Sequence, residues 1–556
     1  MTPPPDSTPA NIKPASDPSP GHPGAKPPLS FLASKWLWVL IIGLLLAGAI
    51  LPALLPEEPA APMEVILLQV NDVYEIAGLD NDSIGGLARI AALKQQLLRK
   101  NKNTLLILAG DFISPSVFNS VKKNDTAVGG EQMVESMNAA KFDLVIFGNH
   151  EFDFSYNILQ RRMDESNFQW LASNVYHKAG KDSTAFQKNR TDLPRSWIKK
   201  FTDGNGRSVS IGFIGLTIPD NMGDPAYASY SPTLATAKQL YDSLSKICDA
   251  VIAITHQDEK DDIILAKAIP GLAAILGGHE HDQRKADVGP VPIRKAYANA
   301  RDACEWRIVF NKKNTRPEVY PTFIRLNMAI PKDSATATVV AKWTTLGKNY
   351  FIGLKYNPDS PVCPLRKDSL DGKDEHVRSG STTLTRLITN AMLWVTKKKY
   401  HTQIALMNAG SVRVDDLITP PITEYSFLRA LPYRGPIQVA DFKGDSLKMI
   451  LDLGATLSGD GAFLQYSENL RKDPTTRLWV IDNVPIDDAR SYRVAIADYL
   501  IRGLQKKMEF IKPYNRVIDF IPKDSTNTDL RFDVVKATIA WYRQTCSASP
   551  SAGPAK

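Results

Sequence analysis

The chain has 556 residues, more than one hydrophobic core normally organises, so two folded domains with additional segments are expected. The formal net charge is +8, but the basic residues are spread along the chain and do not form a block. The composition therefore argues against a nucleic-acid-binding protein and is otherwise that of an ordinary globular protein.

The N-terminal region contains a Pro-rich segment followed by an apolar run. Residues 1–34 are rich in Pro and Ser and poor in large apolar side chains, which predicts a disordered tail, as does the composition of residues 547–556. The uncharged run "WLWVLIIGLLLAGAILPALL" is long enough to cross a bilayer and predicts a transmembrane helix over residues 35–56. A cleaved signal peptide is the competing interpretation, but the run is long, begins late and lacks a clear cleavage site.

Charges on either side of the apolar run predict its orientation. Lys26 and Lys35 precede it and Glu57 and Glu58 follow it, so the positive-inside rule places the N-terminus in the cytoplasm. The rest of the chain would then be extracytoplasmic, in the periplasm or at the cell surface. An oxidising compartment permits a disulfide, although spacing alone assigns no pair. The cysteines are Cys248, Cys304, Cys363 and Cys546.

From Met63 onward, short apolar runs alternate with helical patterns. The runs "VILLQV", "TLLILAG", "FDLVIFG", "DAVIAIT" and "LAAILGG" each end in Gly or polar residues, as buried strands do. In "GGLARIAALKQQLLRK", Ile90, Leu93 and Leu97 fall on one helical face. This alternation predicts an α/β fold whose reactive groups gather beyond the strand ends.

Side chains that can bind metals follow five of these strands. Carboxylates, an amide and imidazoles at successive strand ends are what two divalent metal ions require, with one carboxylate shared by ions about 3.5 to 4 Å apart. Each fragment alone has a structural explanation, since a single His is often a core residue and "GD" is usually a turn. Five fragments in register argue against that explanation. The residues are Asp72, Asp111, Asn149, His150, Asp153, His256, His279 and His281.

This ordered set resembles the 5′-nucleotidase family of the calcineurin-like metallophosphoesterases. The resemblance implies a four-layer α/β/β/α domain over residues 63–330 with two divalent metal ions, for which Mn, Zn, Co and Fe are candidates. It also implies that Asp72, Asp111 and His281 hold the first metal and that Asp111 bridges to the second. The other ligands of the second metal would be Asn149, His256 and His279.

The block "GNHEFD" contains the catalytic pair that the resemblance implies. The metals would lower the pKa of a bound water, so that hydroxide attacks phosphorus in line with the leaving alcohol. His150 would stabilise the developing charge or protonate the leaving group, and Asp153 would orient its ring. A helix cap is the structural alternative for Asp153.

One position departs from the family pattern. The residue two places after the first aspartate is normally a histidine that binds the first metal, and here it is Tyr74. A neutral phenol is a poor ligand for Zn, although a hard trivalent cation can ionise it, and the similar purple acid phosphatases use a tyrosine on iron. Three interpretations stay open. Tyr74 is a ligand that favours Fe or Mn over Zn, it packs while water completes the first metal, or it marks a site that has lost catalysis.

Residues 363–546 resemble the C-terminal domain of the same family. The blocks "RSGSTTLTRLITNAM", "MNAGSVR" and "LPYRGPIQVADFKGDSLKMIL" imply a smaller α/β domain that grips the nucleoside part of a ligand. Arginine pairs with anionic oxygens and aromatic faces stack on bases, whereas surface arginines and a core tyrosine are the structural alternative. The implied substrate contacts are Arg378, Asn408, Gly410 and Arg413 on the phosphate or ribose side and Tyr433 on the base.

The base-binding end of this domain departs most from the family. The family has a Gly-rich turn with a second aromatic residue, whereas this chain has Lys506 and Lys507 there. Either Tyr499 or Phe510 substitutes for that aromatic residue, or the ligand is not a simple nucleotide and the lysines favour a more anionic phosphate. Residues 331–362, between the domains, are predicted to be a linker or edge strands.

These patterns predict a membrane-anchored, extracytoplasmic, metal-dependent phosphohydrolase that acts on nucleotides or related phosphate esters. A cyclic-nucleotide or nucleotide-sugar phosphodiesterase on the same scaffold is one alternative, and a binding protein with a catalytically impaired site is another. No nucleic-acid partner is expected, and the sequence leaves the oligomeric state open.

Overall fold

A computed structural model describes residues 62–219, 226–311, 315–514, 516–524 and 527–547, together with Leu40 and Ile42. The predicted transmembrane segment therefore lies outside the described residues except at those two positions, and so do both expected tails except Ser547. Within the described ranges, no helix is both long and apolar enough to span a bilayer. Residues from Pro62 onward form one compact unit.

A pair of mixed sheets, packed face to face, forms the first domain of this unit. Their strand orders are β19-β18-β1-β2-β5-β6 and β11-β12-β14-β15-β17-β16. The first sheet consists of β1 (Met63–Val70), β2 (Thr104–Leu108), β5 (Leu144–Ile146), β6 (Gln169–Leu171), β18 (Asp302–Phe310) and β19 (Glu318–Arg325). The second consists of β11 (Ser196–Thr202), β12 (Ser208–Thr217), β14 (Ala250–His256), β15 (Ala274–Gly278), β16 (Arg284–Val288) and β17 (Val291–Lys295). Because β1, β2 and β5 are parallel, as are β12, β14 and β15, their carboxyl ends gather at one edge of each sheet.

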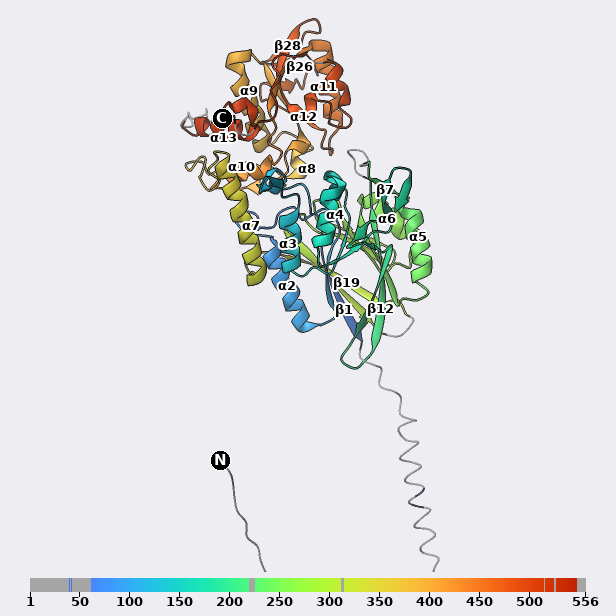
Figure 1. The fold of residues 1–556 in the computed structure, drawn as a ribbon. Coiled ribbons are helices and arrows are strands. Elements are labelled where there is room, and N and C mark those ends of the chain that lie inside the picture. Colours follow the sequence, from blue (N-terminus) through green and yellow to red (C-terminus); the bar gives the residue numbers. More distant parts are fainter. Residues whose placement is uncertain are drawn as a thin grey trace, which may run out of the picture. The chain divides into compact units, whose positions relative to one another are not determined.

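Helices cover the outer faces of both sheets (Figure 1). Alternate residues of β1 show the reason, because Ile66 and Leu68 pack toward the helices whereas Val65 and Leu67 pack between the sheets. The layer order is therefore α/β/β/α, as the family resemblance implies. The covering helices are α2 (Leu87–Lys100), α3 (Glu131–Ala139) and α4 (Tyr156–Glu165) on the first sheet and α5 (Thr233–Leu244) and α6 (Glu259–Ala268) on the second.

The expectation of a linker or edge strands at 331–362 is wrong for most of that segment, which forms helix α7 (Ser334–Gly353). Asp333 caps this helix by accepting a hydrogen bond from a backbone N–H of its first turn. Packing of an apolar stripe against α2 and α3 outweighs the strand preference of the β-branched residues in "TATVVAK". The stripe consists of Trp343, Gly347 and Phe351, which are four residues apart.

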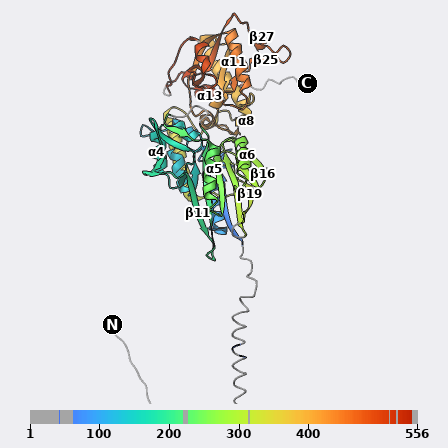
Figure 2. The ribbon, with the colours of Figure 1, turned by 90° about the vertical axis from the view of Figure 1, so that its right-hand side faces the viewer.

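The C-terminal domain, seen from a second side in Figure 2, is built on a smaller sheet with the order β24-β21-β28-β23-β29. Helices α9 and α13 cover one face of this sheet, and α11 and α12 pack on the other. The strands are β21 (Ile404–Asn408), β23 (Ile437–Lys443), β24 (Leu464–Tyr466), β28 (Ser491–Ala497) and β29 (Arg516–Val517). The helices are α9 (Thr383–Tyr400), α11 (Gly444–Thr456), α12 (Asp498–Ile501) and α13 (Val534–Ser547).

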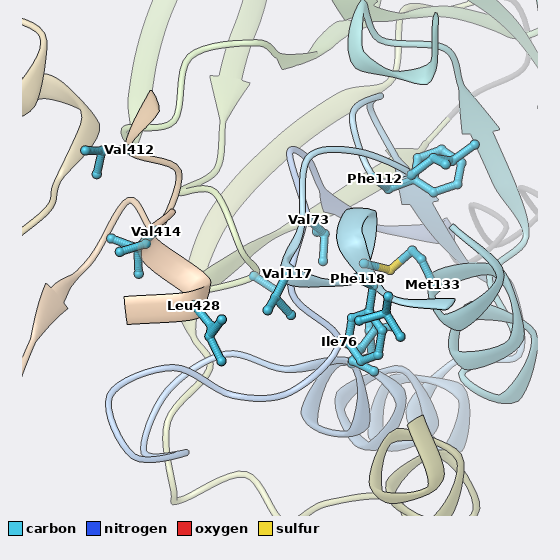
Figure 3. Packing of buried hydrophobic residues seen from close by; sticks show 14 of the residues in the cluster. Val73, Ile76, Phe112, Val117, Phe118, Met133, Val412, Val414 and Leu428 are labelled. Atoms are coloured by element: carbon cyan, nitrogen blue, oxygen red, sulfur yellow. The ribbon is translucent and has the colours of Figure 1, made fainter. Parts of the chain in front are cut away.

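One apolar core extends through both domains. Figure 3 shows where they meet, with Val117 of the short helix η1 (Val117–Ser120) beside Leu428 of α10 (Glu424–Ala430). An ion pair between Arg429 and Glu75, 3.1 Å long, crosses the same boundary. The two domains therefore share buried apolar surface as well as polar contacts.

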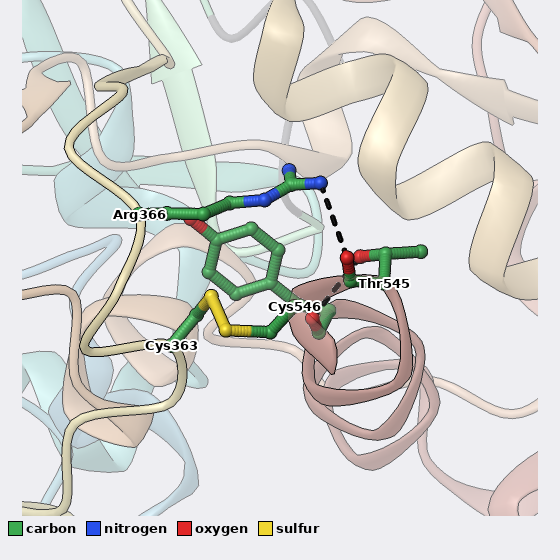
Figure 4. The surroundings of a disulfide bond; sticks show 5 residues. Cys363, Arg366, Thr545 and Cys546 are labelled. Carbon is green, nitrogen blue, oxygen red and sulfur yellow. Dashed lines mark hydrogen bonds between the residues drawn. A yellow bond between two sulfur atoms is a disulfide. The ribbon is translucent and has the colours of Figure 1, made fainter. Parts of the chain in front are cut away.

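A disulfide joins Cys363 to Cys546, with Cα atoms 5.7 Å apart (Figure 4). Cys363 lies at the start of the C-terminal domain and Cys546 in the last turn of α13, so the bond spans 183 residues. Arg366 packs beside it, with its guanidinium 5.4 Å from the centre of the Tyr542 ring. In the described part of the chain, Cys248 and Cys304 are unbridged.

Removing this disulfide should destabilise the C-terminal domain, because the closed loop restricts the unfolded chain. For the double variant Cys363→Ala/Cys546→Ala we expect a loss of about 2 to 4 kcal/mol of unfolding free energy, seen as a lower melting temperature. Cys248→Ala is the control and should melt close to wild type. Equal melting of the double variant and wild type would contradict this expectation.

Candidate metal centre

Sharp turns at the strand ends aim the predicted ligands into one region. Asp72 follows β1 and Asp111 follows β2, and both have positive φ angles, 52° and 60°. Asn149 precedes the short helix η2 (His150–Asp153) after β5, and His256 is the last residue of β14. His279 follows β15 with a φ of 88°.

Asp72, Asp111 and His256 form the buried centre of the site, with ligand atoms within 4.8 Å of one another. His256 Nε2 lies 3.3 Å from Asp111 Oδ2 and 4.0 Å from Asp72 Oδ1. On the other side of the ring, Nδ1 lies 2.8 Å from the carbonyl oxygen of Ala109. That contact assigns the proton to Nδ1 and leaves Nε2 as the nitrogen that can bind a metal.

At the predicted second-metal site, two buried polar atoms lack a hydrogen-bond partner among the described residues. They are His256 Nε2 and Asn149 Oδ1, both predicted ligands of the second metal. An unsatisfied buried polar atom costs about 1 to 3 kcal/mol. A bound cation would satisfy both atoms, so the donor set fits a divalent metal.

The electrostatics of the site also favour positive charge. Burial disfavours the charged form of His256, but Asp111 and Asp72 outweigh burial and raise the pKa of His256 to about 10. Burial raises the pKa of Asp111, yet His256 and His150 together hold it well below its ordinary value. Divalent cations would supply this positive charge while the histidines bind them in neutral form.

Tyr74 lies inside the predicted site of the first metal. Its hydroxyl is 2.9 Å from Asp111 Oδ2, 3.0 Å from His281 Nε2 and 3.3 Å from Asp72 Oδ1. Atoms that share one metal at about 2.0 to 2.1 Å lie about 2.8 to 3.4 Å apart, so these are the separations of neighbouring ligands. Burial, together with Asp111 and Asp72, raises the pKa of Tyr74 well above its ordinary value. A Tyr74 phenolate therefore requires a strongly acidifying cation.

His279 lies next to this centre, but its ring faces another residue. Its backbone N–H donates to Asp72 Oδ2 at 3.0 Å, whereas its Nε2 lies 3.3 Å from Asp258 Oδ1. The ring centres of His279 and His256 are 5.3 Å apart. His279 thus helps to hold Asp72 and presents its Nε2 to a carboxylate.

His150 and Asp153 form a pair, with Nδ1 and Oδ2 separated by 3.0 Å. Ser114 Oγ donates to the same carboxylate oxygen at 2.6 Å, so Asp153 orients His150 and does not cap the helix that follows. Burial lowers the pKa of His150, but Asp153 and Asp111 outweigh burial and raise it above its ordinary value. The backbone N–H of His150 donates to Asp111 Oδ1 at 2.9 Å.

Sequence reasoning missed Glu151, which is fully buried behind the metal region. Its carboxylate accepts four backbone hydrogen bonds of 2.6 to 3.1 Å and ties the Asp111 turn to the "GNHE" turn. Burial and Asp111 raise the pKa of Glu151 to about 7, although the backbone bonds oppose them. An acidic residue directly before an apolar one, within "GNHEF", is the one signal in the sequence. The donors are the N–H groups of Asp111, Phe112, Ile113 and Gly148.

A cavity of about 2050 Å³ brings the two halves of the predicted site together. Its wall contains Asp111, Asn149, His150, Asp153, His279 and His281 from the first domain. From the C-terminal domain it contains Arg378, Asn408, Gly410, Arg413 and Tyr433. Asp72, Tyr74 and His256 are buried beneath this wall.

The C-terminal-domain residues differ in how free they are to bind a ligand. The Asn408 side chain donates to Gln505 and accepts from Ser411, and Arg378 pairs with Asp374 at 2.8 Å. Arg413 is different, because its buried Nε lacks a hydrogen-bond partner among the described residues. Arg413 is therefore the group most available to an anion.

The base-binding end of the cavity is partly open. The Tyr433 side chain is 40% exposed, and the Arg413 guanidinium lies 5.9 Å from its ring centre. Tyr499 lines the cavity, as do Lys506 and Lys507. Phe510 instead packs against the apolar core of the C-terminal domain and does not line the cavity, so it does not supply the second aromatic wall.

Comparison with known proteins agrees with this arrangement. Residues 67–283 match the calcineurin-like phosphoesterase family, and residues 366–510 match the 5′-nucleotidase C-terminal domain. The human 5′-nucleotidase is 24% identical over 520 residues, which is 83% of this chain and 86% of that protein.

Solved structures share the fold over most of the chain. A 5′-nucleotidase precursor from Thermus thermophilus has a TM-score of 0.66 and 20% identity, with 87% of this chain and 97% of that one covered. The sulfate thiohydrolase SoxB from Thermus thermophilus has a TM-score of 0.62 and 15% identity, with 88% and 95% covered. The two domain matches, in this order, together cover more than half of the chain. The protein belongs to the 5′-nucleotidase family of the calcineurin-like metallophosphoesterases and is a phosphoric ester hydrolase.

Proposed function

We propose that the protein uses two divalent metal ions to release phosphate from nucleotides or related small phosphate esters. The observation that carries this proposal is the shared cavity. Its wall contains predicted metal ligands from the first domain together with arginines from the C-terminal domain. A phosphate at the metal centre would leave the rest of a nucleotide next to Arg413 and Tyr433. The human relative is named a 5′-nucleotidase, which agrees with this class of substrate.

We also propose an extracytoplasmic location with residues 35–56 as a membrane anchor. The support is the uncharged apolar run of that segment and the charge difference across it. The Cys363–Cys546 disulfide agrees with an oxidising compartment.

When bound, the two metal ions supply an acidified water and neutralise charge on the phosphate. The chain's own residues position the ester and handle its protons. Asp153 engages Nδ1 of His150 and so leaves Nε2 to donate a hydrogen bond to a charged phosphate oxygen or a proton to the leaving oxygen. The buried Nε of Arg413 has no hydrogen-bond partner among the described residues, so Arg413 would bind the anionic oxygens of the phosphate.

A nucleotide-sugar phosphodiesterase is the second candidate. It is favoured by Lys506 and Lys507 in the cavity wall, because the two charged phosphates of a diphosphate bridge reach farther than a single phosphate and could each face one lysine. Lys507 is paired with Asp460, whereas the exposed Lys506 has no ion pair with a described residue. Diesters cleaved faster than monoesters would favour this candidate.

The function is tested by ester hydrolysis with the full chain, stripped of metal and reloaded separately with Zn, Mn, Co, Mg or Fe. Phosphate release follows the monoesters, and chromatography of the nucleotide products follows the diesters. Substrates are AMP, a nucleotide sugar, a cyclic nucleotide and an aryl phosphate. We expect metal-dependent turnover that falls at least about a thousandfold in Asp111→Asn, because the predicted bridging carboxylate is lost. The exposed Asp182→Asn should keep wild-type activity. If the wild type hydrolyses none of these esters with any of these metals, the proposal is contradicted.

Tyr74 should determine which ion the protein prefers, because its hydroxyl lies at ligand distance from three predicted first-metal ligands. We expect Tyr74→His to shift the preferred ion from Fe or Mn toward Zn, since imidazole suits Zn and a phenol does not. Elemental analysis after loading from an equimolar metal mixture measures this. Tyr74→Phe, which keeps the ring, is the control for packing. An identical metal profile in all three proteins would mean that Tyr74 only packs.

A further inference from the structure

His281 lies between the two domains and presents one ring nitrogen to each. Its Nε2 faces the metal centre, 3.0 Å from the Tyr74 hydroxyl and 3.7 Å from Asp72 Oδ1. Its Nδ1 faces the C-terminal domain, 3.5 Å from Asp415 Oδ2 and 3.9 Å from Asp374 Oδ2. A predicted metal ligand of one domain is therefore in contact with carboxylates of the other.

Two unsatisfied atoms face one another in this contact. Both His281 Nδ1 and Asp415 Oδ2 are buried without a hydrogen-bond partner in the described part of the chain. An imidazole that binds a metal through Nε2 keeps its proton on Nδ1 and needs an acceptor there. A hydrogen bond from Nδ1 to Asp415 Oδ2, formed by a small closing movement, would satisfy both atoms.

The carboxylate of Asp415 is held firmly in this position. Its other oxygen, Oδ1, accepts the backbone N–H of Asp374 at 2.9 Å, and its backbone has a φ of 40°. Arg301, from the first domain, donates to the backbone oxygen of Asp415 and lies 2.9 Å from Asp416 Oδ1. Its Nη1 is also 3.8 Å from Asp415 Oδ2, too far for a hydrogen bond but close enough to favour the ionised carboxylate. Asp374 is the weaker candidate, because it is farther from His281 and is already paired with Arg378.

We propose that Asp415 is a positioning residue for the first metal, supplied by the C-terminal domain, which fixes the ring of His281 and so couples metal binding to the packing of the two domains. This inference rests on the proposed two-metal function. The coupling is reciprocal, because any contact that strengthens metal binding in one arrangement of the domains makes the metal stabilise that arrangement to the same extent.

The test is Mn²⁺ binding to the full chain, followed through the electron paramagnetic resonance signal of free Mn²⁺. We expect Asp415→Ala to weaken one of two bound ions about 10- to 100-fold, which is the usual effect of losing the partner of a metal-binding histidine. Asp415→Asn keeps the shape and an acceptor oxygen and should show a smaller loss, so it remains informative if the alanine variant folds poorly.

Asp416→Ala is the matched control. It removes an ion pair with Arg301 at the same boundary but leaves the His281 contact intact, so Mn²⁺ binding should stay within about twofold of wild type. Asp415→Ala with wild-type affinity for both ions, or a loss in Asp416→Ala as large as in Asp415→Ala, would overturn the inference. A wild type that binds no pair of ions would instead overturn the proposed function on which it rests.

A second readout follows the coupling itself. Amide hydrogen exchange across residues 413–419 should slow when Mn²⁺ is added to wild type or to Asp416→Ala, and should not respond in Asp415→Ala. A metal-dependent change that persists in Asp415→Ala would show that Asp415 does not carry the coupling, and would overturn the inference.

Discussion

The buried pair of carboxylates at Asp72 and Asp111 is the constraint on which the rest of the site depends. Their exposed fractions are 0% and 1%, and two like charges at that depth require positive charge nearby. The two carboxylates raise the pKa of His256, which shows that the site favours a positive charge. The Nε2 of the same ring has no hydrogen-bond partner among the described residues and marks where a cation would bind. Glu151 fixes the position of Asp111, because its carboxylate accepts hydrogen bonds from the backbone N–H groups of the turn that contains Asp111.

The two sheets and the C-terminal domain contribute different groups to the site around Asp72 and Asp111. Parallel strands bring acidic, amide and imidazole side chains to one edge, where local turns set their directions. The C-terminal domain adds Arg413 and Tyr433 to the wall of the same cavity and places Asp415 behind His281. Apolar packing between Val117 and Leu428 joins the two domains near this cavity. Substrate and metal would thus both depend on the packing between the domains.

Particular residues show what the sequence could and could not predict. Asp72, Asp111 and His256 were predictable because each lies at or just beyond the end of a short apolar strand, and parallel strands end at a common edge. Glu151 was not, since its partners are backbone groups and backbone donors leave no pattern in a sequence. Asp415 was missed because its contact with His281 joins positions far apart in the chain. The segment that forms helix α7 was predicted to be a linker or edge strands, because its β-branched residues favour strands. Its apolar stripe is buried only by packing against α2 and α3, which the local sequence does not reveal.

The most direct test of the metal centre is anomalous diffraction from crystals of the full chain soaked in Mn²⁺. We expect two peaks about 3.5 to 4 Å apart, one beside Asp72, Tyr74 and His281 and the other beside Asn149 and His256, with the Asp111 carboxylate between them. A lone peak, or none among these side chains, would contradict the two-metal centre.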